Sequence, residues 1–176
     1  MPISLNDLPT QQELEVFFCE GMRTTGWSSP TPQITAHPYL LEGKQTVYSV
    51  PFGNKHKLLL TDSWRKGEGL TKITLCLEEG GEILLWIMHY RHNKIFPKES
   101  LPFLTSVLHA AYTAGRFYGG RGKSGDFTSS EMLYSNSHSG GFKGFNGVET
   151  LHKLETVSKS RLLLGNTHYW GGLVPG

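Results

Sequence analysis

Two histidines stand at matching places in a repeated sequence pattern and are the first candidates for chemistry. His89-Tyr90 and His168-Tyr169 each follow a leucine, with the histidine four residues after it. Histidine titrates near neutral pH, so either ring would suit the general base of a hydrolase or an isomerase. No Gly-x-Ser-x-Gly motif accompanies them. A structural role, with each ring hydrogen-bonded inside the fold, explains the repetition equally well.

A second matching pair, Asp62 and Asn136, would suit ligand binding. Trp64 lies two residues after Asp62, and Tyr134 lies two residues before Asn136. Because alternate residues of a strand share a face, each polar group would lie among large side chains. One polar group in apolar surroundings is how a small-molecule pocket orients its ligand. It is equally how a hydrogen-bonded polar residue lies in an ordinary core, so both interpretations stay open.

The spacing of the histidine and glycine motifs supports neither a metal site nor a Walker-type phosphate site. In His89-x-x-His92 the rings would lie on opposite faces of a strand and could share a metal only if the chain turned between them. The segment 119–125 contains Gly-Lys-Ser, but Phe117 stands where a Walker loop requires its first glycine. Its backbone amides could still hold an anion, although a surface loop after a helix is the simpler expectation. We expect no metal and no cofactor.

The composition confines these residues to one domain of ordinary size. The chain has 176 residues, of which 38% are hydrophobic and 18% charged, so a disordered chain is excluded. A net charge of +2, with both signs interspersed, predicts no nucleic-acid or acidic-lipid partner. The longest hydrophobic run, 83–88, has six residues and is too short to span a membrane. Because no signal-peptide pattern is present, we expect a soluble cytoplasmic protein in which Cys19 and Cys76 are free thiols.

Two helices are expected at positions 90 residues apart. The first begins after Thr10, which can form a capping box with Glu13, and the second begins at Ser100 after Pro97. Each carries apolar residues at the spacing of a helix that is buried on one side. The two stripes are Leu14, Phe17, Phe18, Gly21, Met22 and Thr25, and Leu104, Val107, Leu108, Ala111, Tyr112 and Gly115. The constant offset predicts two copies of one unit.

Strand patterns follow each helix. They cover 46–52, 57–64, 71–79 and 82–90 in the first half, and 130–137, 145–155 and 161–170 in the second. Glu79-Gly80-Gly81-Glu82 is typical of a tight hairpin. Segment 82–90 is apolar on both faces, so the sheet is either covered on both sides or curled around a pocket. Glu149 is expected in a solvated pair with Lys153 or Arg161.

These elements predict an α+β fold formed by internal duplication of a helix-plus-antiparallel-strands unit. We expect residues 1–176 to form a single domain made of two repeats, about 9–92 and 97–174. The two helices would pack on a curved antiparallel sheet, and a pseudo-twofold axis would relate the repeats.

Several short motifs resemble a family of uncharacterised bacterial domains that occur alone or fused behind Xre-type helix-turn-helix regulators. The motifs are Asp62-Ser63-Trp64, Trp86-x-Met88-x-Tyr90, Tyr134, Gly141-Phe142, Phe145, Gly147-x-Glu149 and Tyr169-x-Gly171-Gly172. The resemblance covers about residues 13–174 and implies no activity. Two elements depart from it: Gly69-Leu70-Thr71-Lys72 replaces a Gly-x-Glu, and Arg121-Gly122-Lys123 replaces an Arg-Gly-Pro.

The function that we expect is a non-enzymatic module that binds or senses a small molecule on an aromatic-lined, concave face of the sheet. Aromatic residues on strand faces, without any catalytic signature, motivate this expectation. The expected ligand-binding residues are Asp62, Trp64, Trp86, Tyr90, Tyr134, Asn136 and Tyr169. One alternative is a hydrolase or isomerase that uses His89 or His168. Another is a structural or protein-interaction subunit that forms a homodimer through an exposed sheet edge.

Overall fold

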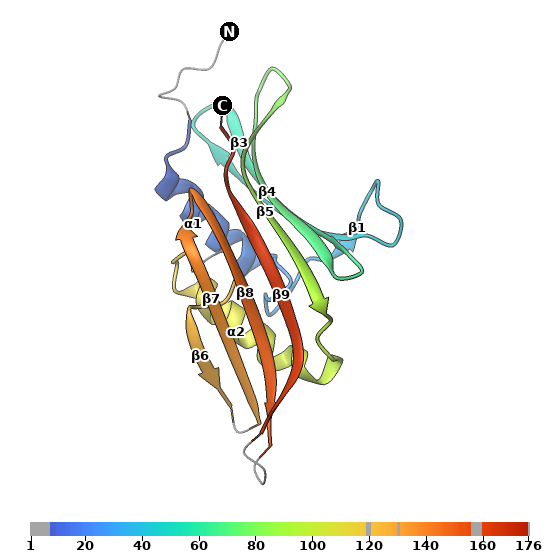
Figure 1. The fold of residues 1–176 in the computed structure, drawn as a ribbon. Helices are drawn as coiled ribbons and strands as arrows, with labels where there is room; N and C mark the ends of the chain where they lie inside the picture. The colour runs from blue at the N-terminus through green and yellow to red at the C-terminus, as the bar shows by residue number, and fades with distance from the viewer. Residues whose placement is uncertain (1–7, 119–120, 130, 156–159, 176) are drawn as a thin grey trace.

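The protein is an α+β structure in which sheet predominates, with helices packed on one face (Figure 1). The computed structural model describes residues 8–118, 121–129, 131–155 and 160–175. Within these ranges there are two α-helices and nine strands, and the strands form one antiparallel sheet. No helix in the described ranges is long and apolar enough to cross a bilayer.

Each α-helix is followed by strands that run back and forth. Helix α1 (Gln11–Thr24) precedes β1 (Thr35–Ala36), β2 (Lys44–Phe52), β3 (His56–Arg65), β4 (Glu68–Cys76) and β5 (Glu82–Lys94). A single 3₁₀ turn (Lys98–Ser100) leads into α2 (Leu101–Thr113), which precedes β6 (Gly125–Thr128), β7 (Met132–Gly141), β8 (Gly144–Leu154) and β9 (Arg161–Leu173). The sequence patterns identified most of these elements, but not the short strands β1 and β6.

The two runs of strands meet in the middle of the sheet. The strand order is β1-β2-β3-β4-β5-β9-β8-β7-β6, so the last strand of each run pairs with the other. In that central pair Tyr90 lies opposite Tyr169, with His89 opposite Trp170 and Arg91 opposite His168. The centre of the sheet therefore joins residues from the ends of both halves.

Both helices begin where the sequence predicts, but only α1 has a capping hydrogen bond from a side chain. The capping box of α1 is present, because the Glu13 amide donates to the Thr10 hydroxyl and the Glu13 carboxylate accepts from the Thr10 amide. Ser100 occupies the N-cap position of α2, as predicted, but its hydroxyl donates to the Pro97 carbonyl at 2.7 Å and caps no helix amide, because the 3₁₀ turn has already begun. Both helices bury the predicted apolar stripe against the sheet.

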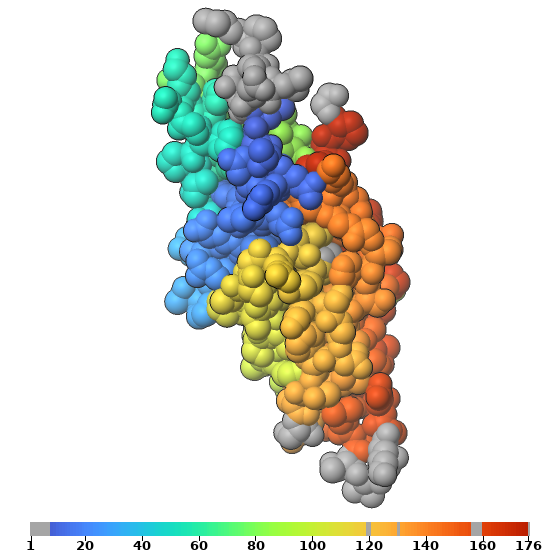
Figure 2. Space-filling model, turned by 90° about the vertical axis from the view of Figure 1, so that its left-hand side faces the viewer, coloured from blue at the N-terminus to red at the C-terminus, as the bar shows by residue number. Residues whose placement is uncertain are grey.

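The core lies between the helices and one face of the sheet. Trp86 on β5 is fully buried, stacks on Phe142 and Phe145 with ring centroids 5.1 and 5.6 Å apart, and donates its indole N–H to the Phe142 carbonyl. Figure 2 shows α1 in blue and α2 in yellow side by side on the covered face. The alternate residues of β5 point to the other face and are half-buried or exposed. The sheet is therefore covered by helices on one side only.

Candidate functional site

A cavity of about 320 Å³ lies between the inner face of the sheet, the end of α1 and the start of α2. Its apolar walls are Met22, Trp27, Trp64, Ile95, Phe96, Leu101, Leu104 and Leu108. Its polar lining residues are Ser28, Asp62, Tyr90, His92, Lys98, Tyr112 and Arg121. Half-buried Trp27 and Trp64 and exposed Ile95 and Lys98 form its rim. The size and lining are those of a small-molecule pocket.

Asp62 is the buried carboxylate of this cavity. It lies on β3 with 3% of its surface exposed, and its Oδ1 accepts hydrogen bonds from Thr71 Oγ1 at 2.9 Å and the Tyr90 hydroxyl at 3.1 Å. Burial raises the pKa of Asp62 above its usual value, although the Thr71 hydrogen bond and the Arg121 charge oppose that rise. Both hydrogen bonds from the described residues end on the same oxygen, so Oδ2 remains to accept from a ligand.

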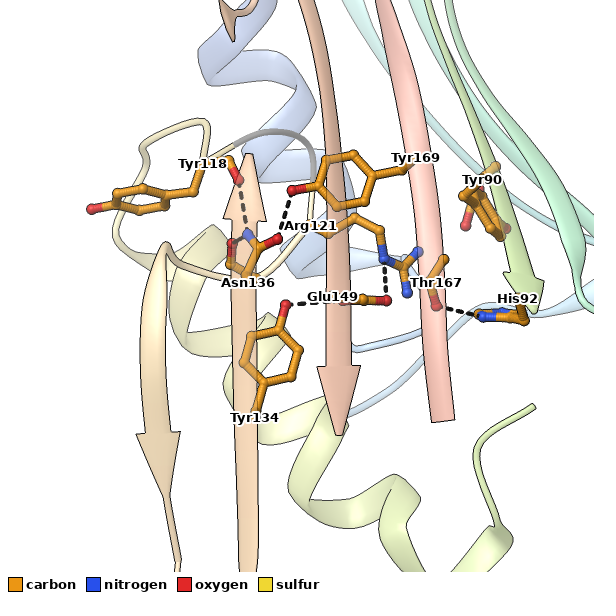
Figure 3. A network of polar contacts seen from close by, with 11 residues as sticks. Tyr90, His92, Tyr118, Arg121, Tyr134, Asn136, Glu149, Thr167 and Tyr169 are labelled. Carbon is orange, nitrogen blue, oxygen red and sulfur yellow. Dashed lines mark hydrogen bonds and ion pairs between the residues drawn. The ribbon is translucent and has the colours of Figure 1, made fainter. Parts of the chain in front are cut away.

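Arg121 supplies a buried cation (Figure 3). Its Nε lies 2.7 Å from Glu149 Oε1, and its guanidinium carbon lies 5.0 Å from the centre of the Tyr90 ring. Although these two atoms are in ion-pair contact, neither Arg121 Nε nor Glu149 Oε1 makes a hydrogen bond to a described residue. Burial lowers the pKa of Arg121, but Glu149 and the neighbouring tyrosines outweigh it, so the side chain stays protonated.

Glu149 and its hydrogen-bonded neighbours fill the interior beside β7, β8 and β9. Glu149 is fully buried on β8 and accepts from the Tyr134 hydroxyl at 2.9 Å. Tyr169 donates to Asn136 Oδ1 at 2.6 Å, and Asn136 Nδ2 donates to the carbonyls of Gly122 and Tyr118 at 2.6 and 3.2 Å. The chain after α2 is thereby fastened over this part of the sheet, and it carries Arg121 inward.

His92 and Ser28 complete the polar lining. His92 Nδ1 lies 2.6 Å from Thr167 Oγ1, and burial, helped by the Arg121 charge, lowers the pKa of His92 to about 4. The imidazole is therefore neutral at pH 7. Ser28 is 4% exposed, and its hydroxyl has no hydrogen-bond partner among the described residues. A buried hydroxyl without a partner is uncommon in native proteins, and this one lines the cavity.

The structure separates the predicted ligand-binding residues into two groups. Asp62, Trp64 and Tyr90 line the cavity. Trp86 packs beneath α1, where it meets Phe18 at 5.0 Å between ring centroids. Tyr134, Asn136 and Tyr169 are buried in the hydrogen-bonded network beside Glu149. The helices cover the face on which all seven were expected to meet a ligand, so the space is a cavity at one end of the interior.

The candidate general bases His89 and His168 lie on the opposite face of the sheet from Asp62 and Asn136. His89 stacks on Trp170, with ring centroids 5.6 Å apart and planes 10° apart, and His168 is exposed. His89 and His92 point to opposite faces, as their spacing predicts. Across the described residues, no three side chains of His, Cys, Asp or Glu gather to hold a metal ion.

Sequence reasoning assigned the buried ion pair wrongly. Glu149 was expected in a solvated pair with Lys153 or Arg161, and the segment containing Arg121 was expected at the surface. Instead both side chains are buried against one another. The alternation along β8 carried a usable signal, because Phe145 and Leu151 share the parity of Glu149 and face the core. For Arg121, which follows a helix in a glycine-rich segment, no such periodicity exists.

Comparison of the chain with known proteins gave no match to a family model, a curated protein or a solved structure. The resemblance to uncharacterised bacterial domains consequently stays a prediction. Several residues that carry it, including Trp86, Tyr90, Glu149 and Tyr169, are buried at the centre of this fold. The function of the chain has to be inferred from the cavity and the groups around it.

Proposed function

We propose that this protein is a non-enzymatic module that binds a small molecule in the cavity beside Asp62 and Arg121. The observation that carries the proposal is the combination of apolar walls with buried polar groups that lack partners for some of their atoms. A ligand pocket has this composition, with few polar groups that fix orientation among many apolar ones. The cavity of about 320 Å³ has room for roughly ten water-sized groups, at about 30 Å³ each.

Polar groups that lack hydrogen bonds in the unliganded cavity cost free energy, and this supports a binding role. A buried polar group without a hydrogen bond costs about 1–3 kcal/mol, and more when it is charged. Among the described residues Ser28 Oγ has no partner, and Arg121 Nε donates no hydrogen bond although it is in ion-pair contact with Glu149. A ligand that pairs with these groups recovers that cost in the complex. Residues held in this way are preorganised for a partner, which lowers the cost of binding.

We also propose that the two halves are copies of one unit, and three matched contacts support this. Tyr90 donates to Asp62 in the first half, and Tyr169 donates to Asn136 in the second. Each tyrosine ring lies directly over a glycine of the preceding strand, Gly69 or Gly147, where an added Cβ would meet the ring. The pairing of β5 with β9 is centred on Tyr90 and Tyr169. The same alignment relates Thr71 to Glu149, since each lies two residues after its glycine.

A plugged variant tests the binding proposal. Leu101 lines the cavity and is half-buried, so Leu101→Trp would fill the space without rebuilding the deep core. Leu162→Trp is the matched control, because Leu162 is 52% exposed and lies away from the cavity on β9. In a thermal-shift screen against a library of small metabolites, we expect compounds that stabilise the unmodified protein and the control but not the plugged variant.

Two results of that screen would contradict the proposal. One is a library in which no compound raises the melting temperature of the unmodified protein. The other is a set of ligands that stabilise the plugged variant as much as the control, because such ligands bind elsewhere.

A further inference from the structure

We propose that the ligand carries an electroneutral polar head in which a hydrogen-bond donor lies beside an acceptor, as in a carboxamide, attached to an apolar body. This inference rests on the proposed binding function and specifies the chemistry of the same cavity. The donor of the head would meet Asp62, and its acceptor would meet Arg121 and Ser28.

The unused atoms of the polar residues define the two halves of this head. Thr71 and Tyr90 both donate to Asp62 Oδ1, which leaves Oδ2 to accept from a ligand N–H. Arg121 Nε donates no hydrogen bond to a described residue, and Ser28 Oγ, in a residue that is only 4% exposed, has no partner among the described residues either. Both line the cavity and can donate to a ligand oxygen.

Asp62 and Arg121 lie close enough to one another that one small head can reach both. The Tyr90 hydroxyl donates to Asp62, and the guanidinium of Arg121 lies over the ring of the same tyrosine, 5.0 Å from its centre. A primary amide presents its N–H and its carbonyl oxygen on adjacent atoms. This compact head matches Asp62 as acceptor and Arg121 as donor, because both lie next to Tyr90.

The charges around the cavity disfavour an ion. Arg121 is already paired with Glu149 at 2.7 Å, so a carboxylate ligand would approach an arginine whose charge is balanced, with Asp62 beside it. An ammonium ligand would meet Asp62 but would lie beside Arg121. The one other cationic lining residue, Lys98, is exposed at the rim, where solvent screens it. A ligand ion of either sign would thus lie beside a like charge, Asp62 for a carboxylate and Arg121 for an ammonium, whereas an amide would not, so the neutral head is favoured.

The test is a matched series of four compounds that share a benzene ring: benzamide, benzoate, benzylamine and acetophenone. Isothermal titration calorimetry with the full chain at pH 7 measures the affinity of each. We expect benzamide to bind at least about tenfold more tightly than either ion, because a mispaired buried charge costs more than 1.4 kcal/mol. Acetophenone keeps the carbonyl but lacks the N–H, so it should bind more weakly than benzamide.

Asp62→Asn sharpens the test by reversing the preference. The amide oxygen of asparagine can keep the hydrogen bonds from Thr71 and Tyr90, while its NH₂ group replaces the accepting Oδ2. Benzamide should then lose about tenfold in affinity, while acetophenone should bind at least as tightly as before. Ser28→Ala removes a hydroxyl that the fold does not use, and it should weaken benzamide and acetophenone alike.

The outcomes separate this inference from the binding function. Tighter binding of benzoate or benzylamine than of benzamide overturns the neutral head but leaves the cavity as a binding site. Equal loss of all four compounds in folded Asp62→Asn also overturns it. A further outcome is that none of the four compounds binds while the metabolite screen still yields ligands that the plugged variant no longer binds. A net charge on those ligands then overturns the neutral head, and a neutral amide-like head on them supports it. Only a screen without cavity ligands removes the binding function itself.

Discussion

Two parts of the interior contain similar hydrogen bonds but differ in the space beside them. In the first half, Asp62, Thr71 and Tyr90 are joined by hydrogen bonds beside a cavity. In the second half, the residues at the matching places are Asn136, Glu149 and Tyr169, and the space beside them is filled. In both halves a tyrosine of the last strand donates to a residue two strands earlier, from β5 to β3 and from β9 to β7. The difference therefore lies in what packs against this shared arrangement.

The chain that follows α2 accounts for the difference. Its carbonyls at Tyr118 and Gly122 accept from Asn136, and its Arg121 forms an ion pair with Glu149, although Arg121 Nε and Glu149 Oε1 make no hydrogen bond to a described residue. The chain that follows α1 contributes Trp27 and Ser28 to the first half, where the Ser28 hydroxyl has no partner among the described residues. The polar groups of the second half therefore face one another, whereas those of the first half lie beside space for a ligand.

Glu149→Gln should have the largest effect on stability, because it leaves the Arg121 charge buried without a counter-ion. We expect the free energy of unfolding to fall by about 3–5 kcal/mol in urea denaturation. The matched change in the first half, Thr71→Val, removes one of the two hydrogen bonds to Asp62 Oδ1 and takes away no counter-ion, so it should cost only about 1 kcal/mol. Equal losses in the two variants would contradict the contrast between the halves. Adding Arg121→Met to Glu149→Gln should restore much of the loss.

The lowered pKa of His92, which lines the cavity, predicts that the free energy of unfolding depends on pH. Its pKa is lowered from 6.5 to about 4, so the stability that neutral His92 contributes is present above pH 6.5 and is lost as the pH falls through 4. Between pH 7 and 4 this amounts to about 3 kcal/mol, at 1.36 kcal/mol for each pH unit. His92→Gln should flatten the decline in unfolding free energy over this window by that amount. An unchanged slope in His92→Gln would show that other groups cause the decline.

Gly69→Ala and Gly147→Ala test the equivalence of the two tyrosines. An added Cβ at either position would meet the ring of Tyr90 or Tyr169, so both changes should destabilise the protein by about 1–3 kcal/mol. We expect the two losses to agree within about 0.5 kcal/mol in thermal or urea denaturation. A loss at only one position would mean that the halves differ in the packing of their tyrosines as well. Gly144→Ala on β8, where nothing lies within 4 Å and φ is not positive, controls for the loss of glycine alone.

Asp62→Asn should give the smallest change in stability, and its sign is informative. Burial raises the pKa of Asp62, so protonated Asp62 favours the folded state, and this contribution is lost as the pH rises through the pKa of the folded protein. Asparagine, which the second half already uses, removes the buried charge. The variant should be stabilised at pH 7 by less than about 1 kcal/mol, and the gain should vanish below pH 3. Destabilisation at pH 7 would show that the ionised carboxylate is needed by the fold.

Much of the fold could be predicted from the sequence, because helices and half-buried strands leave periodic patterns. The stripe that includes Leu14 and Phe18 and the hairpin at Gly80 and Gly81 are examples, and the α+β architecture follows from them. The strand β6 was missed because Gly125–Thr128 is a short edge strand without alternation. The start of α2 at Ser100 was predicted correctly, but the capping hydrogen bond was not, because a 3₁₀ turn and a capped helix share the same residue types.

The candidate site was only partly predictable. Asp62, Trp64 and Tyr90 could be named because alternation places them on one face of the sheet. The positions of Arg121 and Ser28 could not, since both lie in irregular segments whose course depends on the packing of the whole domain. His89 was preferred over His92 because sequence repetition shows equivalence between positions but does not show which face of the sheet is covered.

The most direct test of the account is a crystal structure of the protein soaked with benzamide. We expect electron density for the compound in the cavity, with its N–H on Asp62 Oδ2 and its oxygen facing Arg121 and Ser28. A cavity closed by Trp27 or Trp64 with no room for the compound, or benzamide bound only on the uncovered face of the sheet, would contradict it.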